Sequence, residues 1–400
     1  SGLPPFHVPG SAERSLPASG GPTMLGAVET LGASVEYGAI AIAAGVAPFM
    51  RSPSVQWAMP GTDAQFVHCQ SVQPRPFQFW AGIHGVPWQD IARDPADLTK
   101  GLKVGAELEL ALRMAQRANG VSLLHGEVSR EMFAGLWPGF DTSEVPIGSI
   151  TNGVHASTWV AREIRDLLAA QVGPELAEET QGWESAAGIP AGELWSTKRV
   201  LRQRLVADVR KRLRESWVQR GASDAELGWI DDVLDPDVLT IGFARRFATY
   251  KRAPLLFDDY DTILKLATDP HRPIQFIFSG KAHPADDEGK RQIQKIIHLS
   301  KYSELRNRLV FLENYDVHIA RQMVSGCDVW LNTPRRPMEA SGTSGQKILC
   351  NGGLNLSILD GWFDEAYENS GGWAIGEREP YWEEQDGIHS SAIYYLLESE

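Results

Sequence analysis

From Pro236 onward, short apolar segments alternate with stretches of helical pattern. The apolar segments that we predict to be buried strands are residues 238–243, 274–278, 309–312, 329–331 and 354–359. The stretches that we predict to be helices between most of them are residues 253–267, 286–300 and 317–325. Crossover connections of this kind are right-handed and place helices on the faces of a parallel sheet. The alternation therefore predicts an α/β fold with a doubly wound parallel sheet, whose ligands bind beyond the carboxyl ends of the strands.

Polar and cationic segments follow several predicted strands at the point where each strand ends. Residues 245–252 read Arg-Arg-Phe-Ala-Thr-Tyr-Lys-Arg, residues 279–282 read Ser-Gly-Lys-Ala, and residues 313–315 read Glu-Asn-Tyr. Arginine matches phosphate oxygens in pairs, whereas lysine acts as a mobile point charge. Residues 245–252 also fit a charged loop that pairs with acidic neighbours. The recurrence of polar groups at successive strand ends favours a pocket for phosphate and for a ligand rich in hydroxyls.

Residues 339–347 follow the fourth strand and read Glu-Ala-Ser-Gly-Thr-Ser-Gly-Gln-Lys. Glycines let the backbone approach a bound group, and the hydroxyls of Ser341 and Thr343 can bind an anion together with loop N–H groups. Lys347 stands before an apolar segment, where it loses its charge more readily than in water, and a neutral amine is what an aldimine requires. Alone, the pattern also fits an ordinary surface turn. We interpret it as a catalytic loop because the other strand-end motifs accompany it.

The composition does not suit several classes of protein. A net charge of -13 does not fit nucleic-acid binding as the main role, which usually requires a basic field. The three cysteines, Cys69, Cys327 and Cys350, indicate neither a disulfide framework nor a metal site, and a reducing cytoplasm fits them best. The longest apolar run, residues 37–50, is shorter than the roughly 20 residues that span a bilayer. We therefore expect a cytoplasmic protein with no nucleic-acid or membrane partner.

The first part of the chain carries weaker patterns. Residues 1–104 are rich in Pro, Gly, Ser and Ala and stay unassigned, as a segment that we expect to be loop-rich or poorly ordered. After a helical pattern from Val104, the sequence predicts a turn at 119–121, a short helix at 128–136 and a helix at 160–170. A loop at 151–155 ends in His155, which is either an active-site residue or a loop histidine bonded to backbone.

The clearest helical pattern covers residues 195–219. An apolar side chain recurs every fourth residue along one stripe, at Leu201, Leu205, Val209, Leu213 and Trp217. The basic residues on the remaining surface are Lys198, Arg199, Arg202, Arg204, Arg210, Lys211, Arg212 and Arg214. They could form a polyanion site. We interpret them instead as a solvent-exposed face, because basic residues are good helix formers and no aromatic residues are interleaved with them.

Taken together, these motifs resemble those of the α-glucan (glycogen, starch or maltodextrin) phosphorylases. The residues that carry the resemblance are Arg245, Arg246, Lys251, Arg252, Ser279–Ala282, Leu312–Tyr315, Glu339–Thr343, Lys347, Asn351, Gly352, Asp360 and Gly361. They occur in the order of the family and cover about three quarters of the chain, from near Val104 onward. The motifs resemble those of the shorter bacterial branch of the family. The chain opens on Ser1 and ends within a helical pattern, so we expect a truncated member.

The resemblance implies a two-domain glycosyltransferase of the GT-B type. Residues 105–235 would then be a remnant of the N-terminal, substrate-facing domain with a helical connector, and residues 236–400 the Rossmann-like C-terminal domain, truncated at its end. Orthophosphate would cleave the terminal α-1,4 bond of a glucan or maltodextrin and release α-D-glucose 1-phosphate with retention. The resemblance also implies a cytoplasmic, allosteric enzyme and allows a homodimer. Whether the truncated chain is itself active stays open.

The resemblance also assigns roles to single residues. Pyridoxal 5'-phosphate would be held as an aldimine on Lys347, with its phosphate facing the substrate phosphate. Arg246 and Lys251 would bind the two phosphates with Arg245 close by, and Glu339 would accept a hydrogen bond from a glucose hydroxyl. The residues expected beside the cofactor phosphate or phosphate oxygens are Tyr315, Gly342 and Thr343. The residues assigned as substrate contacts are Asn119, His155 and Ser341.

Two departures from the family pattern and two rival functions stand beside this assignment. Residues 344–346 replace the usual Gly-Asn-Met but keep the length of the loop, whereas Gln116 stands where the long-chain enzymes have a sugar-contacting histidine.

The first rival is a glycogen-synthase-like transferase that uses a sugar nucleotide. Such an enzyme commonly has a second acidic residue eight positions after the first, where this chain has Lys347. The second rival is a non-catalytic glucan-binding fragment.

Overall fold

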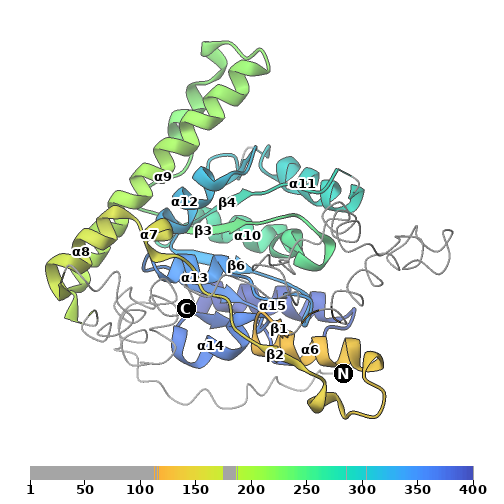
Figure 1. The fold of residues 1–400 in the computed structure, drawn as a ribbon. Coiled ribbons are helices and arrows are strands. Elements are labelled where there is room, and N and C mark those ends of the chain that lie inside the picture. The colour runs from red at the N-terminus through yellow and green to blue at the C-terminus, as the bar shows by residue number, and fades with distance from the viewer. Residues whose placement is uncertain are drawn as a thin grey trace, which may run out of the picture.

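The computed structural model describes residues 112, 115, 117–173, 186, 188–284, 286–302 and 304–399. The expectation for residues 1–104, and most of the helical pattern that begins at Val104, lie outside this described part. Within it, one large α/β unit is accompanied by a small unit formed by β1, α6 and β2 (Figure 1). No helix of the described part is long and apolar enough to cross a membrane.

The large unit is built on a six-stranded parallel sheet. Its strands are β3 (Leu239–Ala244), β4 (Ile274–Ser279), β5 (Leu309–Leu312), β6 (Val329–Asn332), β7 (Leu354–Ser357) and β8 (Trp373–Ala374). Their spatial order is β5-β4-β3-β6-β7-β8, so the chain changes direction between β3 and β6. In sheets of this order, ligands bind in the crevice beyond the carboxyl ends of the strands at that change of direction. The predicted doubly wound sheet is confirmed.

The first five strands agree with the predicted segments to within two residues. Each is almost wholly buried and mainly apolar, although β4 and β7 also contain buried polar side chains, and burial of nearly every residue is the pattern of a strand covered on both faces. The sixth, β8, was not predicted. It contains only two residues, which is too short for a periodic pattern to identify.

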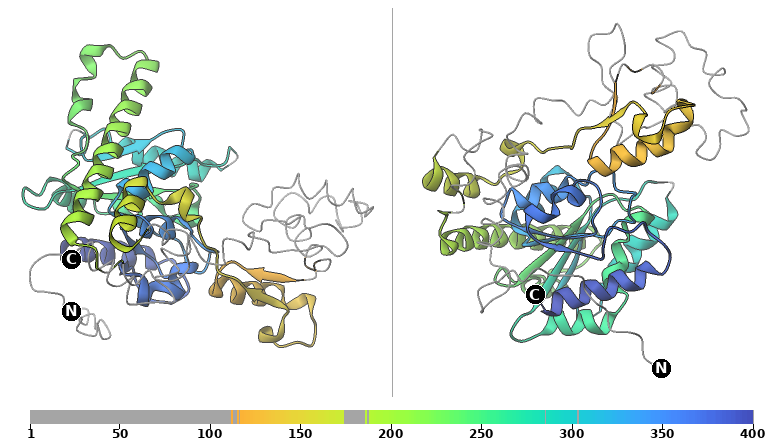
Figure 2. Two further views of the ribbon diagram at one scale, coloured as in Figure 1. Left: turned by 60° about the vertical axis from the view of Figure 1, so that its left-hand side comes forward. Right: turned by 90° about the horizontal axis from the view of Figure 1, so that it is seen from below.

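Two helical layers cover the sheet. One face packs against α10 (Tyr260–Thr268), α11 (Asp287–Leu299) and α15 (Gln385–Ser399), and the other against α9 (Ala191–Gln219) and α12 (Val317–Gly326). Since successive side chains of a strand point to opposite faces, Phe278 packs in the first layer and its neighbour Ile277 in the second. A third apolar cluster joins α7 (Ala156–Trp159), α8 (Arg162–Val172), α13 (Ser344–Leu349) and α14 (Trp362–Ser370). Figure 2 shows α9 extending past the end of the sheet.

The prediction of a wholly solvent-exposed basic face on α9 is wrong at two residues. Lys198 and Arg202 are fully buried where α9 packs against α12 and the start of β6. Lys198 donates hydrogen bonds of 2.7 Å to the backbone carbonyls of Ser325 and Cys327 at the end of α12, and Arg202 lies 2.7 Å from the carboxylate of Asp328. Cations at the carboxyl end of a helix bind its unpaired carbonyl groups. Two of the eight basic residues therefore stabilise the contact between helix and sheet.

The small unit packs against the carboxyl edge of the sheet. It contains β1 (Ala118–Gly120), α6 (Leu123–Phe133) and β2 (Ile147–Ser149), which pairs in parallel with β1. The predicted turn at 119–121 is wrong, because Ala118–Gly120 is a strand. A Cβ atom on Gly120 would lie 2.3 Å from the backbone nitrogen of Gly126, so strand and helix approach more closely than a side chain allows. Ser122 caps α6 by accepting from the N–H of His125 at 3.1 Å.

Candidate functional site

A buried cluster of charges lies where the sheet changes direction. Arg245 follows β3 directly, Lys251 lies in the 3-10 helix η9 (Thr249–Lys251), and Glu339 follows β6. One carboxylate oxygen of Glu339 accepts from Arg245 Nη2 and from Lys251 Nζ, both at 2.8 Å. The three side chains are between 7% and 12% exposed. Sequence motifs that lie almost a hundred residues apart thus meet at the predicted edge of the sheet.

The surroundings of this cluster shift its protonation equilibria. Burial lowers the pKa of Lys251 to about 8, and the nearby charge of Arg245 acts in the same direction. Burial alone would raise the pKa of Glu339, but the charges of Arg245 and Lys251 outweigh it and hold that pKa below its ordinary value. Two cations thus face one carboxylate. Because buried charges in a medium of low polarity attract opposite charges strongly, the cluster has a surplus of positive charge for an anionic ligand.

Arg245 has further capacity for such a ligand. Its Nε and Nη1 atoms are buried and have no hydrogen-bond partner in the described part of the chain. Leaving buried donors unpaired costs about 1–3 kcal/mol each, and more for charged groups. An anion that reached these donors would remove that cost, so the arrangement fits the predicted phosphate site.

Asp360, after β7, holds the backbone of Glu339 in place. Its carboxylate accepts from the N–H of Glu339 at 2.9 Å and from the N–H of Gly361 at 2.8 Å. Burial raises the pKa of Asp360 to about 7, although these two hydrogen bonds act against the rise. The backbone of Gly361 has a φ of +58°, and a Cβ atom there would lie 2.3 Å from the carbonyl oxygen of Ser341. The Asp360-Gly361 pair thus fixes the segment that carries Glu339 and Ser341.

We expect the stability of the folded chain to fall as the pH rises through 7, because of Asp360. The folded pKa lies above the ordinary value of 3.8, so the folded state holds the proton more tightly. This contribution is complete below about pH 4 and is lost as the pH rises through the folded pKa. Between pH 5 and pH 7.5, the free energy of unfolding of the wild type should fall relative to that of Asp360→Asn by on the order of 2 kcal/mol.

Urea unfolding at the two pH values, followed by circular dichroism, measures this difference. Other groups titrate in the same range, and the comparison with Asp360→Asn cancels them. An identical pH dependence in the two proteins would show that Asp360 does not titrate near neutrality.

Lys347 lies in α13, whereas the sequence placed it at the end of a loop. Its Nζ atom lies 3.9 Å from the ring centroid of Trp159, which follows the loop at 151–155. Burial lowers the pKa of Lys347 to about 8. A substantial fraction of its amine is therefore neutral and nucleophilic near pH 8, as covalent attachment to an aldehyde requires.

The segment between Glu339 and α13 forms a turn of small residues. Ser341 is fully buried and its Oγ has no hydrogen-bond partner in the described part of the chain, while the backbone of Gly342 has a φ of +84°. Trp362 fixes the turn, since its backbone N–H donates to the carbonyl of Ser341 at 2.9 Å and its indole Nε1 to that of Gly342 at 3.1 Å. Thr343 is half-buried and precedes the first residue of α13, without a capping hydrogen bond from its side chain. The turn keeps small polar groups beside Glu339.

The remaining residues predicted for the site differ in their burial and in their contacts with this centre. Arg246 is exposed; its charge acts on Lys251 and its side chain is hydrogen-bonded to Tyr250, and no ion pair joins it to a carboxylate in the described residues. Tyr315 is half-buried, and the charge of Arg245 acts on its hydroxyl, whose pKa burial raises. His155 is exposed, with Nδ1 2.7 Å from Thr158 Oγ1. Asn119 is half-buried in β1.

Arg252 positions the site, although the sequence analysis gave it no separate role. Arg252, with a φ of +44°, donates to the carbonyls of Thr333 and Pro334 at 2.9 and 2.8 Å and lies 2.7 Å from Asp386. It thus ties the segment that carries Lys251 to the chain that leads from β6 to Glu339. A left-handed residue between Lys251 and Ala253 leaves no sequence signal when it is not glycine.

Contacts between the small unit and the large one lie beside the site. Ser122 Oγ donates to the carbonyl of Ala340 at 2.8 Å, and Gln346 Nε2 donates to the carbonyl of Asn152 at 2.6 Å. Asn351, one turn after Lys347, donates to the carbonyls of Trp159 and Lys347. The segments at 119–122 and 151–159 are therefore anchored to the turn and helix that carry Ser341 and Lys347.

Among the residues that the structure describes, no group of three or more His, Cys, Asp or Glu side chains could hold a metal ion. The site contains two buried cations, the neighbouring carboxylates of Glu339 and Asp360, small polar residues and a lysine of lowered pKa. Such a set suits a phosphorylated ligand held by side chains of the protein itself.

Comparisons with known proteins identify the family of this chain. The family model described as carbohydrate phosphorylase matches residues 106–372. The glycogen phosphorylase of Mycobacterium tuberculosis strain H37Rv is 52% identical over 290 residues, which are 72% of this chain and 34% of that protein. The glycogen phosphorylase of Aquifex aeolicus is 41% identical over 330 residues, 81% of this chain and 47% of that protein.

A third relative is the maltodextrin phosphorylase of Thermococcus litoralis, 41% identical over 296 residues, which are 73% of this chain and 35% of that protein. This chain thus spans between about a third and a half of the length of these three relatives. The match covers the strand-end motifs, the turn before α13 and Lys347. The chain belongs to the carbohydrate phosphorylase family, a family of glycosyltransferases with the GT-B fold.

Proposed function

We propose that this chain provides the phosphate- and cofactor-binding part of an α-glucan phosphorylase. The proposed reaction is cleavage of a terminal α-1,4-glucosidic bond by orthophosphate, giving α-D-glucose 1-phosphate with retention. The observation that carries the proposal is the buried group of Arg245, Lys251 and Glu339, which combines two cations with one carboxylate at the carboxyl edge of the sheet. The names of the relatives point to the same class of substrate.

In the proposed reaction, the cations gather and orient phosphate. Arg245 and Lys251 would neutralise phosphate oxygens in a site that is shielded from water, where fixed charges stabilise a transition state most effectively. Arg246, which is exposed next to this pair, would bind the incoming substrate phosphate at the entrance. Glu339 would turn from the cations to a glucose hydroxyl as phosphate replaces it. The cleaved bond develops positive charge on the sugar, which the gathered phosphate oxygens stabilise.

The residues present also fit pyridoxal 5'-phosphate as cofactor. Lys347 offers an amine of lowered pKa for covalent attachment, and Trp159 lies against that amine. The unpaired hydroxyl of Ser341 and the turn at Gly342 and Thr343 offer donors for phosphate oxygens. When bound, the cofactor supplies a phosphate that exchanges a proton with the substrate phosphate, since the second pKa of a phosphate monoester lies at about 6.

The other assigned residues keep supporting roles in this proposal. Tyr315 would lie beside the phosphate group of the cofactor, because the charge of Arg245 already reaches its hydroxyl. Asn119 and His155 would contact the glucan from the small unit, whose loops are hydrogen-bonded to the turn at 340–346. We also propose a cytoplasmic enzyme that acts without a nucleic-acid or membrane partner. A homodimer is compatible with the family.

A donor assay tests the proposal against its rivals. With maltoheptaose, orthophosphate and pyridoxal 5'-phosphate, the proposal predicts release of glucose 1-phosphate and no glucosyl transfer from UDP-glucose. The glycogen-synthase-like alternative predicts the reverse, because that class uses a sugar nucleotide as donor. A protein that binds maltoheptaose and turns over neither donor would be the glucan-binding fragment.

A further inference from the structure

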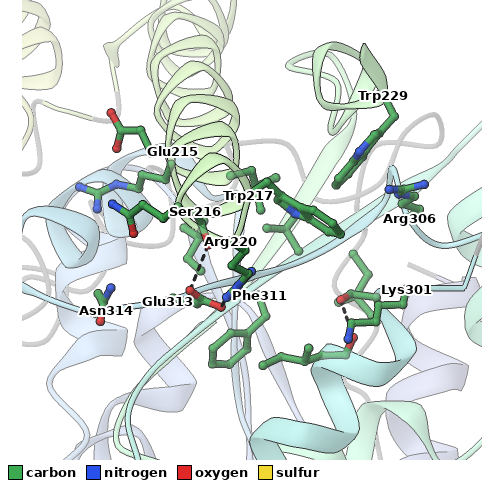
Figure 3. Close-up of a pocket in the computed structure, with 18 residues that line it drawn as sticks. Glu215, Ser216, Trp217, Arg220, Trp229, Lys301, Arg306, Phe311, Glu313 and Asn314 are labelled. Carbon is green, nitrogen blue, oxygen red and sulfur yellow. Dashed lines mark hydrogen bonds and ion pairs between the residues drawn. The ribbon is translucent and has the colours of Figure 1, made fainter. Parts of the chain in front are cut away.

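A cavity of about 410 Å³ lies outside the strand-end cluster, along β5 at the edge of the sheet (Figure 3). Its walls come from the last turns of α9, the 3-10 helix η8 (Gly228–Asp232), the end of α11 and the residues of β5 with the loop that follows it. Cavities of this size hold small ligands or a few units of a polymer. None of the functions proposed above uses it.

The apolar part of this β5 cavity is aromatic. Trp217, near the end of α9, and Trp229, in η8, have ring centroids 5.8 Å apart and planes at 82°. The guanidinium of Arg306 stacks on Trp229 at 3.8 Å from the ring centroid and holds that ring in place. In Figure 3 the ring of Trp217 points into the centre of the cavity, with Phe311 below it. Tryptophan gives a large, rigid apolar face at little cost in conformational entropy.

The polar part combines donors and acceptors side by side. Glu313 pairs with Arg220 and accepts from Ser216 Oγ at 3.1 Å (Figure 3). Asn314, with a φ of +57°, lies next to this pair and also lines the cavity. The remaining charged side chains of the lining are Arg212, Glu215, Lys301 and Arg306. Four cations and two carboxylates thus line the cavity, but Arg220 is paired with Glu313, Arg212 with Asp208, and Arg306 lies against Trp229. A wholly apolar ligand would leave these polar groups without partners.

A ring that has an apolar face and many hydroxyls satisfies both parts of the lining. Each hydroxyl can donate to Glu313 and accept from Arg220 without breaking their ion pair, while the C–H face of the ring lies on an indole. We propose that the β5 cavity is a second binding site for an α-1,4-glucan, separate from the catalytic site. The chemistry of the lining is independent of the proposed activity, whereas the choice of an α-1,4-glucan rests on the proposed function.

The position of the cavity favours a polymer that also serves as substrate. The loop that closes the cavity at Glu313 and Asn314 continues into Tyr315, on which the charge of Arg245 acts. The cavity and the catalytic cluster therefore share one loop at the carboxyl end of β5. A glucan held at Trp217 would keep its free ends near the catalytic site.

The test is a titration of the protein with maltoheptaose, followed by the indole N–H signals of the ¹⁵N-labelled tryptophans. We expect the signals of Trp217 and Trp229 to shift, and the affinity measured from them to fall at least about tenfold in Trp217→Ala, followed through Trp229, and in Glu313→Ala. Trp382→Ala is the matched control, because Trp382 is 43% exposed and lies outside the cavity. Circular dichroism verifies that each variant is folded.

The outcomes separate this inference from the proposed activity. Arg245→Ala should lose phosphorolysis and keep the tryptophan shifts. Shifts that are absent, or that are unchanged by both substitutions in the cavity, would overturn the second site even if the protein releases glucose 1-phosphate. Shifts that disappear with Trp217→Ala would support the site even if no phosphorolysis occurs.

Discussion

Replacing Lys347 with alanine should abolish phosphorolysis of maltoheptaose, with a loss of at least about 10³-fold. The reason is that this side chain offers an amine of lowered pKa, against the ring of Trp159, for covalent attachment of the cofactor. Lys347→Ala removes the attachment and the orientation that depends on it. We expect the variant to fold, because the lysine amine makes no hydrogen bond within the described part of the chain and α13 keeps its buried residues Ile348 and Leu349.

Two measurements check this prediction. The rate of glucose 1-phosphate release reports the loss of activity, and the near-ultraviolet absorbance of protein separated from free pyridoxal 5'-phosphate reports the loss of the bound cofactor. Lys211→Ala is the matched control, since Lys211 is exposed on α9 and should leave both quantities unchanged. A Lys347→Ala variant that keeps activity and absorbance would contradict the assignment.

Replacing Lys251 with alanine should lower kcat/KM for orthophosphate by about 10² or more, from the loss of one preorganised charge. Lys251 is buried and paired with Glu339 at 2.8 Å, so its charge acts in surroundings of low polarity where it is strongest. Arg245→Met should act in the same direction. Arg246→Ala should also lower the rate if that exposed side chain binds the incoming phosphate.

The pH dependence distinguishes a loss of charge from a loss of structure. Lys251 has a pKa of about 8, so the wild-type rate at low phosphate should fall as the pH rises through that value, and Lys251→Arg should shift the fall to higher pH. Lys290→Ala, on the surface of α11, is the control for a lysine of the same domain. A Lys251→Ala variant with the wild-type rate would remove Lys251 from the phosphate site.

The sheet was predictable because its first five strands are mainly apolar segments separated by helical patterns. β4 and β5 illustrate this, since their bounds follow the ends of the runs. Hydrophobic periodicity does not predict which surface of the protein a helix packs against. Lys198 and Arg202 read as exposed positions of an amphipathic helix, yet the end of α12 and Asp328 provide acceptors that bury both of them.

The same distinction holds for the site. The rule that ligands bind at the carboxyl ends of parallel strands predicted that the motifs around Arg245, Lys251 and Glu339 converge. It could not predict that Glu339 binds both cations at once, because that depends on side-chain geometry. It also gave no role to Trp159, which reaches Lys347 only through the packing of α7 against α13 and α14.

In the described part of the chain, desolvation lowers the pKa of Lys198, Lys251 and Lys347 to about 8. Their chemistry alone therefore does not select the one that binds the cofactor. The geometry does, because Lys198 is committed to the carbonyls of α12 and Lys251 to Glu339, whereas Lys347 faces an aromatic ring.

The most direct test of the central claim is to locate the cofactor by mass spectrometry. The protein is incubated with pyridoxal 5'-phosphate, reduced with borohydride and digested, and the mass of each lysine-containing peptide is measured. We expect one stoichiometric label, on the peptide that contains Lys347. A label on Lys251, on Lys198 or on surface lysines without preference, or no label at all, would contradict it.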